Sequence, residues 1–160
     1  MSRRTPSLGV PGSVGKESAM LVRMELSRIL IRELNDFQVI ELREVSEGTD
    51  VLEDPRSFPI VIGLPEAQAI ERRLKGVTIQ RPQTHDLLAN VIEALGASLD
   101  SISITELREH TYYATLDVRN AEGESVQIDA RPSDAIALGI AGEVPIFVDD
   151  AVIAAAQEPG

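Results

Sequence analysis

Apolar residues in the first third of the chain alternate with charged ones. Runs of this kind cover residues 21–34 and 37–45, with the turn-forming pair Asn35 and Asp36 between them, and a shorter apolar run covers 57–62. Such alternation is typical of β-strands that bury one face. The first third of the chain is therefore predicted to form three strands.

The spacing of apolar residues then becomes helical in two segments. Pro65 and Gly76 bracket a predicted helix over 65–76, because proline suits the first turn of a helix and glycine its end. A second helix is predicted over 84–95, with Gly96 closing it. Its apolar residues fall on one face: Leu87, Leu88, Val91, Ile92 and Leu95.

The second half of the chain repeats this scheme. Strands are expected over 98–107, 112–118 and 125–130, followed by a helix over 133–140, a short strand over 145–148 and a final helix that ends near Ala156. This order predicts an α+β fold in which helices pack on a largely antiparallel or mixed sheet. Similar strings, such as IGLPEAQAI at 62–70 and IDARPSDAIA at 128–137, favour an internal duplication of a strand–strand–strand–helix unit.

Residues 1–19 differ from the rest of the chain. They are rich in Ser, Gly and Pro and have no hydrophobic period, so we expect a disordered tail followed by a single domain over 20–160. No apolar run is long enough to span a membrane, and the N-terminus lacks the apolar core of a signal peptide. A cytoplasmic protein without a membrane partner is the expectation.

The charge of the chain restricts its partners. Fifteen basic and 26 acidic groups give a formal charge of −11, which repels a phosphate backbone at long range. Contact with nucleic acid must therefore depend on a local group of cations. Cysteine is absent, which excludes disulfides, thiol nucleophiles and Cys-based metal sites. No glycine-rich nucleotide-binding motif occurs in a strand–helix context, so no nucleotide or redox cofactor is expected.

Two segments concentrate polar groups where a helix is about to begin. They are Arg81–Asp86 and Asp129–Asp134, and each contains Arg-Pro, then a hydroxyl, then an Asp. Capping accounts for part of this pattern, because Thr84 and Ser133 suit helix N-caps and the Asp residues suit the positive end of a helix dipole. Capping requires neither the histidine nor the two arginines.

Brought together in one cleft, these segments could catalyse phosphodiester hydrolysis. A divalent ion such as Mg²⁺ or Mn²⁺ would take oxygen ligands from Asp86, Asp129 and Asp134, and His85 would act as general acid or base. Arg81 and Arg131, with the hydroxyls of Thr84 and Ser133, would bind the phosphate. The alternative is a network of buried ion pairs that only fixes the helix starts.

Other nuclease chemistries fit the sequence less well. A carboxylate–lysine core requires an acidic residue two positions before a lysine, and the two lysines, Lys16 and Lys75, have none there. A ribonuclease with two imidazoles would need His85 and His110 to converge, whereas His110 lies in a predicted hairpin turn. Tyr112 and Tyr113 should point to opposite faces of a strand, one into the core and one free.

The strings RPQTHDLL (81–88), REHTYYATL (108–116), IDARPSDAIAL (128–138) and PIFV (145–148) resemble the bifunctional nuclease family. The resemblance covers about residues 21–156. It implies a compact α+β domain that tends to form homo-oligomers and, in plant members, cleaves both DNA and RNA. The matched polar positions are Arg81, Thr84, His85, Asp86, Asp129, Arg131, Ser133 and Asp134. His110 departs from the family, which usually has glycine there.

Two hypotheses of different classes follow from the sequence. The first is a metal-assisted nuclease acting on DNA and RNA. The second is a non-catalytic, oligomeric binding or regulatory module, favoured by the acidic charge and the small number of lysines and aromatic residues. A purely structural oligomer is a further alternative, for which the apolar segment AVIAAA (151–156) offers a contact surface.

Overall fold

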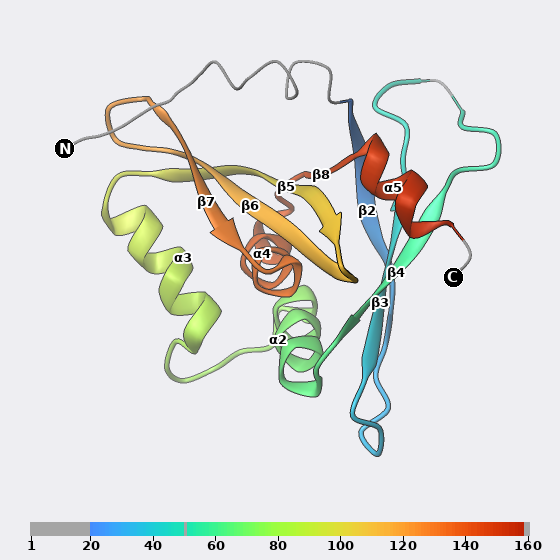
Figure 1. Cartoon of the computed structure of the whole chain (residues 1–160). Coiled ribbons are helices and arrows are strands. Elements are labelled where there is room, and N and C mark those ends of the chain that lie inside the picture. The colour runs from blue at the N-terminus through green and yellow to red at the C-terminus, as the bar shows by residue number, and fades with distance from the viewer. Residues whose placement is uncertain (1–19, 50, 159–160) are drawn as a thin grey trace.

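The computed structural model describes residues 20–49 and 51–158, so the tail expected over 1–19 lies outside the described residues. Within them, seven strands form one mixed sheet that carries four α-helices (Figure 1). The strands are β2 (Leu21–Leu30), β3 (Gln38–Glu44), β4 (Ser57–Ile62), β5 (Ser98–Arg108), β6 (Thr111–Arg119), β7 (Ser125–Ala130) and β8 (Ile146–Asp149). The helices are α2 (Leu64–Lys75), α3 (Thr84–Ala94), α4 (Pro132–Gly139) and α5 (Asp150–Ala156), and a 3₁₀ turn covers Ile140–Gly142.

The sheet has the strand order β4-β3-β2-β8-β5-β6-β7. All neighbouring strands are antiparallel except β5 and β8, which are parallel. The strands β2–β4 and β5–β7 therefore form two antiparallel meanders, each followed by a helix, and β8 joins them. The α+β class with a mixed sheet is confirmed, whereas an internal duplication of the two halves stays a prediction.

One face of the sheet carries the core. Strand pairing aligns Met24 with Ile146, Ile146 with Ile102, and Ile102 with Leu116, and all four side chains are buried. Because paired residues point to the same face, this row defines the face against which α2, α4 and α5 pack. The opposite face is polar where Ser103, Thr115 and Asp129 pair across β5, β6 and β7.

The first hairpin ends earlier than the sequence predicts. β2 stops at Leu30 instead of residue 34, because the buried amide of Gln38 organises the following turn. The Gln38 Nε2 group donates to the carbonyl oxygens of Arg32 at 3.0 Å and Asn35 at 2.9 Å, and its Oε1 accepts from the Arg32 N–H. The Gln38 side chain thus holds the loop between β2 and β3 in place of further pairing between these strands.

The second helix, α3, lies beside α4 at the edge of the molecule (Figure 1). Its predicted apolar face is present, but no residue of α3 is buried, and Leu87, Leu88, Val91 and Leu95 are all exposed. Only Ala89 and Ile92 pack partly against the core. In the part of the chain that the structure describes, no helix is long and apolar enough to cross a membrane.

Candidate functional site

The start of α4 brings an arginine and a carboxylate together. Arg131 is the N-cap in extended conformation, and Pro132 occupies the first turn, where the missing N–H costs nothing. Asp134, also in the first turn, accepts hydrogen bonds from Arg131 Nε at 2.8 Å and Nη2 at 3.2 Å. Ser133, between them in the chain, is buried. The local sequence therefore fixes a two-pronged arginine–carboxylate contact at the helix start.

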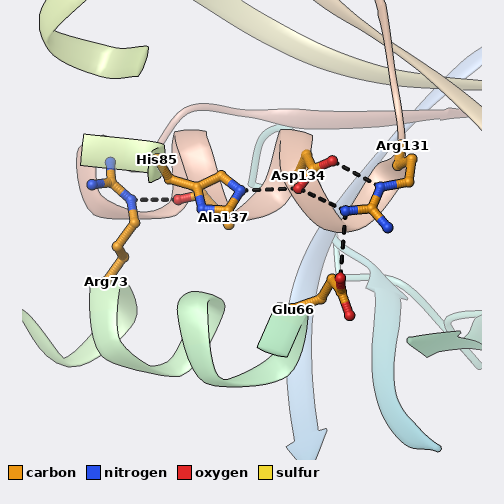
Figure 2. A network of polar contacts seen from close by, with 6 residues as sticks. All are labelled: Glu66, Arg73, His85, Arg131, Asp134 and Ala137. Atoms are coloured by element: carbon orange, nitrogen blue, oxygen red, sulfur yellow. Dashed lines mark hydrogen bonds and ion pairs between the residues drawn. The ribbon is translucent and has the colours of Figure 1, made fainter. Parts of the chain in front are cut away.

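Residues from two other helices extend this contact. His85, in the first turn of α3, donates from Nε2 to Asp134 Oδ1 at 3.0 Å, and Arg131 Nη2 lies 3.5 Å from Glu66 Oε2 in α2 (Figure 2). The His85 side chain is mostly buried, at 14% exposure, whereas Arg131 is 63% exposed. The imidazole is therefore oriented by a carboxylate while the guanidinium remains open to a ligand.

Asp134 keeps its charge in this setting. Burial acts to raise the pKa of the Asp134 carboxyl, but hydrogen bonds from Arg131 and His85 outweigh it and hold the pKa below its ordinary value. The carboxylate is then available to accept a hydrogen bond from the imidazole.

Asp86 is occupied in a different contact. Its carboxylate accepts from Arg72 Nη2 at 2.8 Å, from Arg73 Nη1 and from the backbone N–H of Gln83 at 2.9 Å. Burial acts to raise the pKa of Asp86, but the Gln83 and Arg72 hydrogen bonds and both arginine charges lower it below its ordinary value. Arg73 also donates to the carbonyl oxygens of Ala137 and Leu138 near the end of α4, so it links three helices.

The capping roles considered for Thr84 and Ser133 are wrong. The N-cap residues are Gln83 for α3 and Arg131 for α4, so each hydroxyl residue lies inside its helix. In α4 the proline takes the first helical position, and the cap, Arg131, lies two residues before the hydroxyl residue Ser133.

A hollow of about 380 Å³ adjoins Arg131 and Ser133. We call it the Arg131 pocket. It is lined by Asp36, Phe37, Ile60, Val61, Ile62, Gly63, Glu66, His110, Thr111, Tyr112, Arg131, Pro132 and Ser133. Among these residues Arg131 is the one arginine or lysine, and an anion entering the pocket would meet it.

Sequence comparisons identify the family. A family model described as the bifunctional nuclease domain matches residues 50–159, which include α2 to α5 and every residue of the contacts above. This chain belongs to the bifunctional nuclease domain family. The matched part of the domain begins before β4, so β2 and β3 lie outside it.

Relatives of this bifunctional nuclease domain include an uncharacterized protein of Mycobacterium tuberculosis. It is 44% identical over 101 residues, which cover 63% of this chain and 59% of the mycobacterial protein. Bifunctional nuclease 1 of Oryza sativa subsp. indica is 27% identical over 108 residues, 66% of this chain and 31% of the rice protein. Bifunctional nuclease 1 of Arabidopsis thaliana is 27% identical over 109 residues, 66% of this chain and 32% of its own length. The chain thus aligns with less than two thirds of each relative.

Not all candidate residues of this domain come together. Arg81 and Thr84 are exposed, and among the described residues neither side chain forms an ion pair or hydrogen bond with the Arg131 contact. Asp129 pairs with Thr115 across the sheet, between Ile128 and Ala130, and Ala130 packs against the core. Because side chains alternate along a strand, Asp129 points to the face opposite α4.

The three carboxylates expected to share a metal ion therefore lie in three different settings. Asp86 binds two arginines, Asp134 binds Arg131 and His85, and Asp129 lies on the other face of the sheet. Over residues 20–49 and 51–158, no three His, Asp or Glu side chains are grouped so that they could hold a metal ion. These residues do not fit a shared divalent ion as they are arranged.

His110 and Glu66 line the pocket but are not among the site residues predicted from the sequence. Glu109 and His110 have φ of 51° and 64°, the left-handed conformation of both central residues of a tight hairpin turn. The signal for His110 was its presence where the family usually has glycine. Glu66 gave no comparable signal, because an acidic residue in a first helical turn is common.

Proposed function

We propose that this domain hydrolyses phosphodiester bonds in DNA and RNA at the His85–Asp134–Arg131 contact, at the edge of the Arg131 pocket. The observation that carries the proposal is the His85–Asp134–Arg131 chain of contacts, in which an oriented imidazole and an exposed guanidinium share one carboxylate beside a pocket. Membership of the bifunctional nuclease domain family supports it.

In this proposal the guanidinium of Arg131 binds a non-bridging phosphate oxygen and stabilises the charge that develops there. Water attacks phosphorus as the bond to the leaving oxygen breaks. The proton of the attacking water goes to His85, and the leaving oxygen takes a proton from solvent. Asp134 orients His85 and stabilises the imidazolium that forms. No step is assigned to a metal ion held by Asp86, Asp129 and Asp134.

The test compares Asp134→Asn and Arg131→Gln with the wild-type protein on labelled single-stranded DNA and RNA, with and without Mg²⁺ or Mn²⁺. Removing the group that stabilises the developing charge, or the carboxylate that orients the general base, lowers rates by about 100-fold or more, so both variants should fall by at least that factor. Asp100→Asn is the matched control. Asp100 does not line the pocket, and it forms a similar ion pair, in which Arg119 Nε lies 3.0 Å from its carboxylate.

Equal cleavage by the wild-type protein and Asp134→Asn would reveal a contaminating nuclease and contradict the proposal. A comparable loss in Asp129→Asn, seen only with added metal, would instead support the three-carboxylate metal site expected from the sequence. Asp129 is exposed on a strand, so this variant is expected to fold.

A non-catalytic binding module is the second candidate. It is favoured by the contacts that His85, Asp134, Arg131 and Glu66 make with one another, which would also serve only to fix the three helices. Oligonucleotide binding without cleavage, together with an oligomer in light scattering, would support this alternative.

A further inference from the structure

The Arg131 pocket has an aromatic wall that the proposed hydrolysis does not use. The chain contains two Tyr and three Phe, and two of these five residues, Phe37 and Tyr112, line this pocket together with His110. Rings beside a single guanidinium are the combination with which proteins hold a nucleotide, since the base stacks and the phosphate binds the cation.

Phe37 is presented to solvent by a rigid loop. Its side chain is 70% exposed, although burial of a phenylalanine ring normally stabilises a protein. The neighbouring Gln38 is 1% exposed, and its amide binds the backbone of Arg32 and Asn35, as described above. The loop thus fixes the backbone next to Phe37 before any ligand arrives, which lowers the entropy that binding would cost.

Tyr112 and His110 form another part of this wall. The Tyr112 ring stacks on Phe58 with centroids 5.6 Å apart and an interplanar angle of 30°, and Phe58 is buried. His110 is held beside it in the left-handed turn. Both parts of the wall are therefore preorganised, one by a hydrogen-bonded loop and one by ring packing.

We propose that the Arg131 pocket is a subsite for one unpaired nucleobase, placed next to the phosphate that Arg131 binds. The inference rests on the proposed nuclease function and adds the base-binding role of Phe37. A base inside a duplex is stacked on both sides and cannot enter such a pocket, so the ligand class is single-stranded nucleic acid. Phe37 lies outside residues 50–159, which the family model matches.

The test measures binding by fluorescence anisotropy under non-hydrolysing conditions, with Asp134→Asn as background. The probes are a labelled single-stranded DNA octamer and an abasic octamer of equal length and charge. The base-bearing probe should bind about tenfold more tightly, since stacking on one aromatic ring is of that order. Phe37→Leu should abolish this difference without weakening the binding of the abasic probe.

Leu34→Ala is the matched control, because Leu34 is an exposed apolar residue of the same loop that does not line the pocket. Equal affinity for the two probes, or a base preference that survives Phe37→Leu, would overturn the subsite. So would a smaller particle in light scattering for Phe37→Leu, because Phe37 would then belong to a subunit contact.

The two proposals fail separately. Base preference that depends on Phe37, without any cleavage by the wild-type protein, would retain the subsite and refute the hydrolysis. Cleavage that depends on Asp134, without base preference, would support the hydrolysis and refute the subsite.

Discussion

His110, which lines the Arg131 pocket, has a left-handed backbone conformation that few residues other than glycine adopt. Its φ is 64°, and the preceding Glu109 is also in the left-handed region. Non-glycine residues in this region carry strain of about 1 kcal/mol or more. Strain of this kind at a pocket supports a role for the imidazole there.

His110→Gly is therefore expected to increase the free energy of unfolding by about 0.5–1 kcal/mol, because glycine takes this conformation freely. Oligonucleotide binding should weaken in the same variant, since the imidazole leaves the pocket. Urea unfolding and anisotropy measure the two effects. Glu143→Gly is the control: Glu143 has φ of 55° outside the pocket, so stability should rise and binding should not change. Lower stability of His110→Gly would show that the imidazole contacts outweigh the strain.

The sequence predicted part of the site because the two Arg-Pro segments mark helix starts. His85, Arg131 and Asp134 do meet, as expected from those segments. Arg72 and Arg73 were missed because they contact Asp86 only after α2 and α3 have packed. The position of Asp129 could have been found from strand alternation, since the adjacent Ala130 packs against the core.

At the scale of elements, α2, α3 and α4 are joined at Asp86 and Arg73. The Arg73 side chain is 8% exposed and reaches α3 and the end of α4. Its guanidinium donates to the carbonyl oxygens of Ala137 and Leu138 in the last turn of α4, where helix carbonyls lack the regular intrahelical partner. This junction holds His85 near Asp134.

Asp86→Asn tests the junction through pH. The folded-state pKa of Asp86 lies below its ordinary value of 3.8, so its stabilising effect is complete above that pH and is lost as pH falls through the lowered pKa. At pH 7 the free energy of unfolding of the variant should be about 1–3 kcal/mol lower than that of the wild type, because both arginines lose a charged partner. The difference should shrink between about pH 5 and pH 2.

Urea unfolding at several pH values measures this effect. Asp100→Asn, which breaks an exposed ion pair with Arg119, is the control and should change stability by less than about 1 kcal/mol. A constant difference at all pH values would show that the Asp86 charge does not stabilise the junction.

Most strands and helices could be predicted because their signals are local. Strands β4 and β7 have the expected boundaries, and Gly76 ends α2 with φ of 65° as a glycine C-cap should. The exposure of α3 could not be predicted, because its apolar face is ordinary in sequence and only the tertiary arrangement leaves it uncovered. The position of β8 in the sheet could not be predicted either, since it pairs with strands that are distant in the sequence.

The whole molecule carries a charge of −11 and presents one arginine at its pocket. Each phosphate contact with a single strand contributes about −0.7 to the slope of log affinity against log salt concentration. One or two contacts predict a slope of about −0.7 to −1.4, far shallower than for proteins that coat DNA. Anisotropy between 50 and 300 mM salt measures it. A slope steeper than about −3 would require cationic contacts that the pocket does not contain.

The position of β8 also determines when this domain can assemble on the ribosome. Each meander pairs only strands that are neighbours in sequence, so both can form as the nascent chain emerges. The inner edges of β2 and β5 remain open until residues 146–149 have been synthesised and enter between them. Until then the two edges can pair with other chains, so the interval before β8 arrives is when the domain is most exposed to aggregation.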